Sequence, residues 1–148
     1  KNDILVMMKM HEEISNKSTI SKKTWLLNGE MIKNNNGLLV KVTLNKKIIS
    51  YFFVIYTKTD AYYFSSCTYR EYFSRFSNIT HKSVIYVLKY LIKIGCKTFT
   101  LGDCKTIYSS GPFSEKEKSI QQFKNSFGGS IYTNYYFRNL DQNFSKFF

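Results

Sequence analysis

The chain has 148 residues, of which 43% are hydrophobic, so it is long enough to form one domain with a substantial core. Its formal net charge is +12, which favours a polyanionic partner such as RNA, a nucleotide or a sugar phosphate. No stretch is long and apolar enough for a membrane-spanning helix, and no secretory signal opens the chain, so we expect a cytoplasmic protein.

The composition also limits what the charge and the cysteines mean. Lysine is abundant together with Asn, Ile, Phe and Tyr, as a biased genomic base composition would also produce, so a polyanionic partner stays open. Cys67, Cys96 and Cys104 form no Cys-x-x-Cys pair, which argues against a disulfide framework or a zinc site. Two scattered histidines predict no metal site. Because the first residue is Lys1 rather than Met, we expect a piece of a longer protein.

Two helices are predicted at the start of the chain. Residues 4–14 have helical periodicity with Met and Leu facing inward. A second helical pattern opens at Ser21 and stops at the run Asn34-Asn35-Asn36-Gly37. The single tryptophan, Trp25, is interpreted as a core anchor of this second helix.

Three strands follow, separated by short turns. Residues 38–44 alternate between apolar and polar side chains, which predicts a strand with one buried face. Residues 48–57 are almost all β-branched or aromatic, as in a central strand covered on both faces. Residues 61–67 form the third strand. The short turns predict an antiparallel meander.

A helix and a fourth strand come next. The helix is predicted from Ser77 or Thr80 to about Ile94. Its buried face is predicted to carry Val84, Val87, Leu88, Leu91 and Ile92. Residues 96–101 form a short strand. Because a helix intervenes, this strand should run parallel to residues 61–67 by a right-handed crossover.

The last helix is the best marked element. Ser114 and Glu117 have the spacing of a capping box, and the helix is predicted over residues 115–127. Gly128 and Gly129 supply the left-handed conformation that ends it. Residues 130–137 are predicted as a last strand, and the aromatic tail 138–148 is expected to dock on the body or on a missing part of the protein.

One lysine stands out on this last helix. Ile120, Phe123 and Phe127 fall on one apolar stripe, and Lys124 lies at its edge. Such a lysine either snorkels to water or directs its ammonium at a group that needs positive charge. The residues alone leave both interpretations open, and Lys116 falls in the same sector earlier in the helix.

The predicted order is α-α-β-β-β-α-β-α-β, an α/β (α+β) fold with a mixed central sheet and helices on both faces. This order resembles the acyltransferase fold of the GNAT superfamily of N-acetyltransferases. Within it, Phe123-Lys124-x-x-Phe127-Gly128-Gly129, preceded by Ile120, resembles the C-terminal motif of FemA/FemB-type aminoacyltransferases and their acetyltransferase-like relatives. Further matching segments are Tyr62-Tyr63-x-Ser65-Ser66 with Tyr69-Arg70-Glu71, Thr80-His81, Gly95-x-Lys97-x-Phe99-x-Leu101-Gly102-Asp103, and Ser21-x-x-Thr24-Trp25.

The resemblance implies an activity and its partners. Proteins of this type usually have two such domains, and residues 1–148 resemble the second, so an N-terminal domain of the same protein is expected. They transfer an acyl or aminoacyl group to an amine, with aminoacyl-tRNA among the donors and peptidoglycan precursors or other cell-envelope amino sugars among the acceptors, in bacteria. Residues 67–80 contain no glycine, whereas the coenzyme A loop of the superfamily needs glycines to cradle pyrophosphate. Acyl-CoA is therefore the less favoured donor, and aminoacyl-tRNA is preferred.

The resemblance also assigns Phe123 and Lys124 to the active site, with Lys124 stabilising the oxyanion. Asp103 either accepts a proton from the amine or caps the following turn. Arg70 binds a phosphate or pairs with a neighbour such as Glu71. Tyr63 lines the acceptor site or packs in the core.

Three further points complete the site. His81 and Gly128 are the other substrate-binding candidates, with His81 alternatively capping its helix. A Cys104–His81 nucleophile–base pair has no supporting motif. Two interpretations compete with an acyltransferase. One is a non-catalytic half-domain that binds RNA or sugar phosphates, and the other is a scaffold whose aromatic tail packs on a partner.

Overall fold

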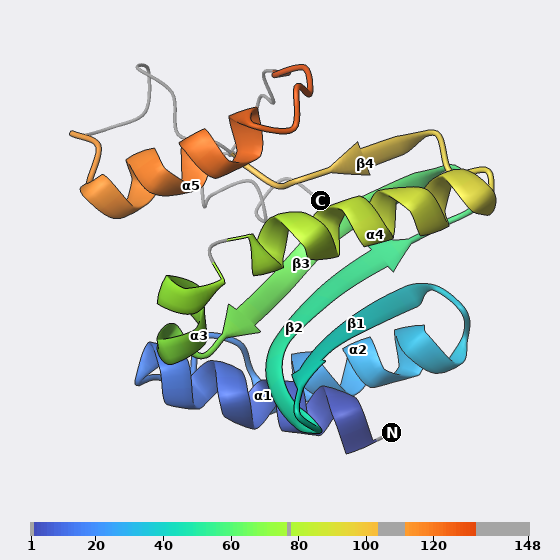
Figure 1. Ribbon diagram of the computed structural model, residues 1–148. Coiled ribbons are helices and arrows are strands. Elements are labelled where there is room, and N and C mark those ends of the chain that lie inside the picture. The colour runs from blue at the N-terminus through green and yellow to red at the C-terminus, as the bar shows by residue number, and fades with distance from the viewer. Residues whose placement is uncertain (1, 77, 104–111, 133–148) are drawn as a thin grey trace, which may run out of the picture. The chain divides into compact units, whose positions relative to one another are not determined.

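The computed structural model of the chain describes residues 2–76, 78–103 and 112–132 (Figure 1). The chain divides into two compact units, Lys1–Asp103 and Cys104–Phe148, and each is described by itself. The first unit carries the sheet and most of the helices, and the second carries helix α5.

Two helices form the start of the first unit. Helix α1 spans Asn2–Ser15 and helix α2 spans Lys22–Lys33. Ser21 caps α2, because its side-chain oxygen accepts a hydrogen bond from the Thr24 backbone N–H at 3.1 Å. Both predicted helices are confirmed, with α1 two residues longer at its start than the sequence pattern indicated.

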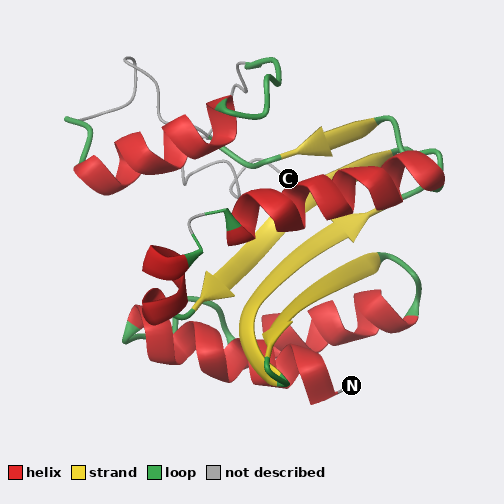
Figure 2. Ribbon diagram, viewed as in Figure 1, coloured by secondary structure: helices red, strands yellow, loops and turns green. Residues whose placement is uncertain are grey.

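The sheet has four strands in the order β1-β2-β3-β4 (Figure 2). They span Gly37–Leu44, Lys47–Tyr56, Asp60–Thr68 and Thr98–Thr100. The pairs β1–β2 and β2–β3 are antiparallel, and β3–β4 is parallel. The predicted meander and the parallel fourth strand are both confirmed.

Two helices connect β3 to β4. The short α3 (Arg70–Arg75) comes first, then the longer α4 (Ile79–Lys93). Gly95, at a φ of 82°, follows α4. The sequence analysis missed α3, because six residues are too few to show helical periodicity. It also placed the start of α4 wrongly: the N-cap is Asn78, not Ser77 or Thr80.

Helices cover both faces of the sheet, α1 and α2 on one and α4 on the other (Figures 1 and 2). The first face buries a cluster of Ile4, Met7 and Met10 from α1, Trp25 from α2, and Tyr51, Phe53 and Cys67 from the strands. Trp25 is fully buried, as expected of a core anchor.

Helix α4 buries a narrower stripe than its sequence indicated. Val84, Val87 and Leu91 are buried, but Ile92, predicted to face inward, is 72% exposed. Ile92 lies about 100° around the helix from Leu91, at the margin of a stripe that contacts only β1 and β2 strongly. The apolar periodicity therefore overestimated how much of α4 the sheet covers.

The second unit contains α5, which spans Glu115–Asn125. Ser126 is its C-cap, two residues before Gly128 with its φ of 69°, so the helix ends two residues earlier than predicted. Residues 130–132 are not in a strand, and the rest of the predicted last strand and the tail lie outside the described residues. Among the described residues no helix meets the length and apolarity needed to cross a bilayer.

Candidate functional site

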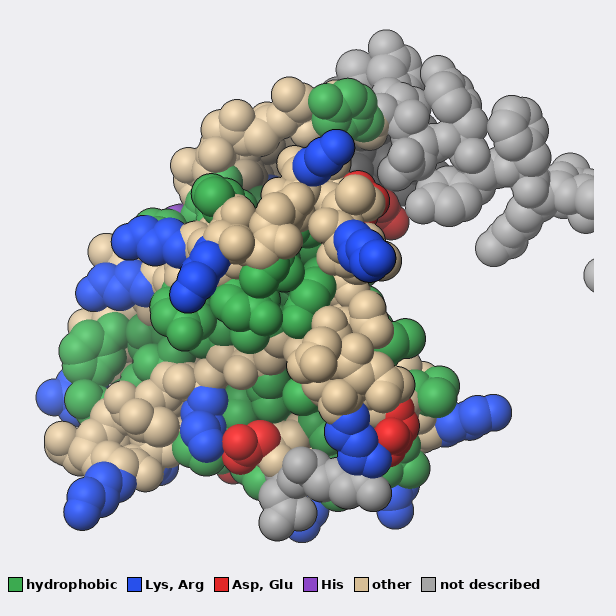
Figure 3. Space-filling view, turned by 90° about the vertical axis from the view of Figure 1, so that its right-hand side faces the viewer, with side chains coloured by type: hydrophobic (Ala, Val, Ile, Leu, Met, Phe, Trp, Pro, Cys, Tyr) green, Lys and Arg blue, Asp and Glu red, His purple; other side chains and the backbone are tan. Residues whose placement is uncertain are grey.

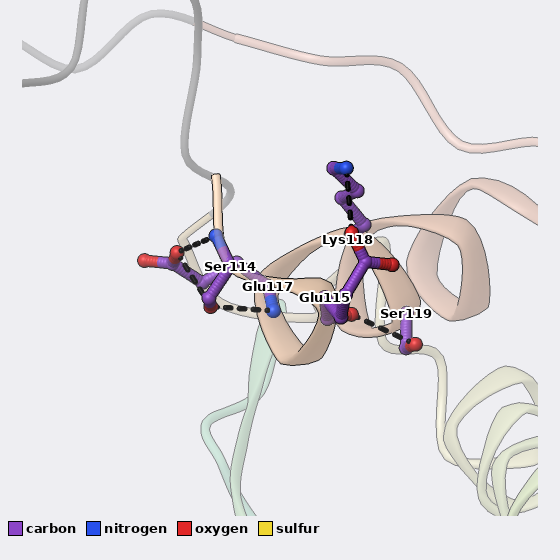
Figure 4. A network of polar contacts seen from close by, with 5 residues as sticks. All are labelled: Ser114, Glu115, Glu117, Lys118 and Ser119. Atoms are coloured by element: carbon purple, nitrogen blue, oxygen red, sulfur yellow. Dashed lines mark hydrogen bonds and ion pairs between the residues drawn. The ribbon is translucent and has the colours of Figure 1, made fainter. Parts of the chain in front are cut away.

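The capping box of α5 fixes where the helix begins (Figure 4). The Glu117 backbone N–H donates to Ser114 Oγ at 3.3 Å, and the Ser114 backbone N–H donates to Glu117 Oε2 at 2.8 Å. Ser114 Oγ also lies 2.8 Å from that carboxylate oxygen. One turn on, Lys118 Nζ contacts Glu115 Oε1 at 2.7 Å. These contacts hold the register of the helix that presents Lys124 two turns later.

Lys124 is half-buried on α5, between the two phenylalanines of its motif. The rings of Phe123 and Phe127 meet edge to face, with centroids 5.2 Å apart. Phe123 and Phe127 are one helical turn apart and lie on either side of Lys124 in the sequence.

Tyr63, the acceptor-site candidate on β3, packs against the sheet. A register shift opposite Phe53 and Val54 lets Tyr63 and Ser66 share one face of β3. The Tyr63 ring stacks on Phe52 at 4.8 Å, and its hydroxyl lies 2.8 Å from Ser66 Oγ. Burial raises the pKa of the Tyr63 hydroxyl, so it is a neutral hydrogen-bonding group. Core packing, the alternative for this residue, is what the geometry supports.

Arg70 and His81 lie on the two helices that follow β3. Arg70 is the first residue of α3 and is exposed. Its expected ion-pair partner Glu71 contacts Lys47 Nζ at 3.4 Å. His81 is half-buried in the first turn of α4, whose N-cap Asn78 makes no side-chain cap hydrogen bond. His81 is the third residue of α4, and its capping of the helix stays a prediction.

Asp103 is exposed and follows β4 after Leu101 and Gly102, which has a φ of 79°. It stands at the carboxyl end of the parallel strand, as the sequence predicted, where open sheets bind ligands. Cys104 lies outside the described residues, so the Cys104–His81 hypothesis has no geometry. The first unit thus carries Asp103, Arg70, Tyr63 and His81, and the second carries Lys124, Phe123 and Gly128.

The segment between β3 and α4 is where the resemblance places a coenzyme A pyrophosphate. The described residues between β3 and α4 contain no glycine and no residue with positive φ. A backbone cradle for phosphate needs consecutive N–H groups turned inward, which a left-handed residue supplies. Here α3 uses the backbone of residues 70–75 for its own hydrogen bonds instead.

Sequence reasoning missed a groove in the first unit. It has a volume of about 840 Å³ and runs along all of residues 38–44 of β1, with the α3–α4 connection and the first half of α4 as its other wall. Arg75 and Lys82 are the cations of that second wall. The alternation of residues 38–44 predicted a buried face but carried no signal that it stays partly open.

Comparison with solved structures supports the fold. An aminoglycoside acetyltransferase from an uncultured soil metagenomic sample, in complex with sisomicin, matches with a TM-score of 0.65 at 13% identity, over 95% of this chain and 91% of that one. A transcriptional regulator from Bacillus halodurans matches with a TM-score of 0.65 at 14% identity, over 95% of both chains. A predicted acetyltransferase from Clostridium acetobutylicum, with acetyl-CoA, matches with a TM-score of 0.64 at 12% identity, over 97% and 94%.

At these identities the matches establish the fold and not the activity. The chain has the mixed α/β architecture of the GNAT acetyltransferases, as the order of its elements indicated. No protein-family model and no curated protein sequence matches the chain. The narrower resemblance to FemA/FemB-type enzymes stays a prediction.

Proposed function

We propose that this domain transfers an acyl or aminoacyl group to an amine, with Lys124 as the group that stabilises the oxyanion. The observation that carries the proposal is the GNAT fold, because the two matched acetyltransferases share it over nearly the whole chain. The first of them is in complex with sisomicin, an aminoglycoside, and the second with acetyl-CoA. The half-buried Lys124 beside the Phe123–Phe127 pair supplies a cation on a rigidly capped helix.

The reaction requires the protein to stabilise an oxyanion, to accept a proton and to bind a phosphate of the donor or acceptor. The amine nitrogen attacks the acyl carbonyl carbon, and the carbonyl oxygen becomes an oxyanion that the Lys124 ammonium stabilises. Asp103 accepts the proton that the nitrogen loses. The carbon–oxygen bond to the tRNA ribose then breaks, and the departing oxygen takes a proton. Arg70 binds a phosphate of the donor or acceptor.

The donor proposed here is an aminoacyl-tRNA rather than an acyl-CoA. The net charge of +12 favours a polyanion. The segment between β3 and α4 has no glycine, and its described residues include none with the left-handed conformation of a pyrophosphate cradle. The acceptor proposed is an amine-bearing precursor of the bacterial cell envelope, such as a peptidoglycan intermediate or an amino sugar. An N-terminal domain of the same protein completes the enzyme.

Donor binding and transfer are the direct test. The protein is titrated with charged tRNA, uncharged tRNA and acetyl-CoA at two salt concentrations, while the fluorescence of Trp25 and the tyrosines is followed, and transfer to amino-sugar acceptors is measured with a radiolabelled acyl group. Salt-sensitive binding of charged tRNA with transfer is expected. Transfer from acetyl-CoA alone would overturn the donor assignment and leave N-acyl transfer standing.

A second function is favoured by one specific observation, the excess of lysine. A domain that only binds RNA or a sugar phosphate would show a steep salt dependence of binding and no acyl transfer from any donor. That result, if it is also obtained with the longer chain that includes the N-terminal domain, would overturn the catalytic proposal. The same titration therefore separates an enzyme from a binding half-domain.

A further inference from the structure

A histidine of α1 packs against the buried tryptophan of α2, and the proposed reaction makes no use of it. The rings of His11 and Trp25 meet edge to face, with centroids 5.7 Å apart and an interplanar angle of 62°. Trp25 is fully buried and His11 is half-buried. Both residues lie on the helices that cover one face of the sheet, so this contact belongs to the interface between α1 and α2.

This interface contains buried polar atoms without a hydrogen-bond partner. Among the described residues, His11 Nδ1, Trp25 Nε1 and Asn28 Nδ2 are such atoms. Asn28 lies one turn after Trp25 on α2 and is 4% exposed. The indole Nε1 of Trp25 can only donate, so it cannot accept a hydrogen bond from His11. Because the atoms are buried, the packing of the two helices and the sheet sets their environment.

A proton on His11 is poorly accommodated in this contact. In the imidazolium ion both ring nitrogens carry a hydrogen, so Nδ1 would become a charged donor without an acceptor. A buried donor without a partner costs free energy, and a charged one costs more. Burial accordingly lowers the pKa of His11, against the opposing effect of the Glu12 carboxylate. The packed state therefore favours the neutral ring.

The charged groups around the contact act in opposite directions. Glu12 follows His11 on α1 and favours the protonated ring. On α2, Lys22 and Lys23 share the first turn with Trp25, at the positive end of the helix dipole, and oppose a further positive charge. Lys and Arg side chains also project across the face drawn in Figure 3, and the net charge of +12 makes another proton on the folded chain less favourable.

The sheet surrounds this contact with groups that are neutral near pH 7. The ring of Trp25 meets that of Phe64 on β3 edge to face, with centroids 6.3 Å apart. Burial raises the pKa values of Tyr51 and Cys67, which belong to the same core, to about 12. Within this packing, His11 is the side chain whose ordinary pKa lies between about pH 5 and 8.

We propose that the contact between His11 and Trp25 is an acid-sensitive latch, which holds α1 on α2 and opens when His11 is protonated. The released helix binds the proton more readily than the packed one, so acid favours release. The stabilisation is fully present above the ordinary pKa of histidine, about 6.5, and is lost as the pH falls from there through the lower pKa of the packed state. Because Trp25 also contacts Phe64, opening removes a contact of β3. The latch is independent of the proposed acyl transfer.

The test follows Trp25, the single tryptophan of the chain, as the pH is lowered from about 7.5 to about 5.5. Because Trp25 is fully buried, acrylamide should quench its fluorescence poorly while α1 is packed. We expect the quenching constant to rise by at least about twofold in acid. We also expect the hydrogen-exchange protection of the α1 amides to fall at least about fivefold more than that of the β2 amides.

Two neutral variants and one control identify the titrating group. His11→Phe keeps a ring against Trp25 but cannot be protonated, so it should abolish the acid response. His11→Gln is also uncharged in this range and should give the same result if the phenyl ring does not fit. The control, His81→Phe, makes the same change at the other histidine of the chain, on α4, and should keep the response of the wild type. Circular dichroism at about pH 7.5 checks that the variants are folded.

Several outcomes would overturn the proposal. Unchanged quenching of the wild type in acid would mean that the contact does not respond to protonation. An equal response of both His11 variants would assign the effect to another group, and its loss in His81→Phe alone would assign it to α4. A matching loss of protection in β2 would mean global unfolding rather than release of α1. Slower exchange of α1 in acid would mean that the imidazolium ion stacks favourably on Trp25, so that acid closes the contact instead.

Discussion

The ring of Tyr63 stacks on that of Phe52 at a centroid distance of 4.8 Å and an interplanar angle of 25°. The stack joins β2 to β3. The hydroxyl of Tyr63 is engaged with Ser66 at 2.8 Å. Tyr63 is therefore a structural residue whose replacement should change stability before it changes activity.

Tyr63→Phe keeps the stack and removes the contact with Ser66. We expect a loss of about 1 kcal/mol in the free energy of unfolding, measured by urea denaturation, because one hydrogen bond disappears. Tyr63→Ala should cost about 3–5 kcal/mol, since it also leaves a cavity. Unchanged stability of Tyr63→Phe together with lost amine binding would return Tyr63 to the acceptor site.

Lys124→Ala should lower the turnover of acyl transfer by roughly 10²–10³-fold, if the ammonium is the main partner of the oxyanion. The matched control is Lys116→Ala, which removes an exposed lysine from the same sector of α5. It should leave kcat nearly unchanged. Equal turnover of the Lys124→Ala and wild-type proteins in a steady-state assay would exclude this role for Lys124.

Ser114→Ala removes one half of the capping box of α5. We expect α5 to lose about 1 kcal/mol of stability, which would appear as faster hydrogen exchange of its amides. Ser119→Ala is the control, because Ser119 Oγ only donates to the Glu115 carbonyl within the helix at 3.0 Å. If the α5 amides exchange hydrogen at the same rate in both variants, the capping box does not stabilise α5.

The hydrogen bonds to the Asp60 carboxylate lead us to expect that the folded protein loses stability in acid. The hydroxyls of Thr59 and Thr98 donate to its carboxylate and lower its pKa. Because the folded-state pKa lies below the unfolded one, the stabilisation is present above the usual pKa of aspartate and fades as the pH falls through the folded-state pKa. Thermal melts of Asp60→Asn should therefore depend less on pH than wild type below about pH 4. If the melting temperatures of both proteins depend on pH in the same way, the Asp60 carboxylate does not contribute to acid stability as expected.

The order of the elements was readable from the sequence because it rests on local signals. The capping pairs at Ser21 and Ser114 and the glycines at positions 95 and 128 mark helix ends by backbone chemistry alone. The near-continuous apolar run of β2 indicated a strand covered on both faces, and residues 51–54 are buried. These features depend on a few neighbouring residues, so no distant contact was needed to predict them.

Other features were decided by tertiary contacts. Helix α3 has no capping side chain and only six residues, so the packing between β3 and α4 fixes it. Ile92 fits the apolar periodicity of α4 but stays exposed, because the sheet covers only a narrow stripe of that helix. The shared face of Tyr63 and Ser66 depends on a register shift between two strands, which no single strand reveals.

The sequence by itself determined every described helix and strand except α3, the capped helix that carries Lys124, and the excess of positive charge. Only the tertiary structure decided how narrow the buried stripe of α4 is, that the Tyr63 ring packs against Phe52, and that a groove lies beside β1. Helix caps and periodicity act over a few residues, whereas burial and open edges depend on which distant segments meet.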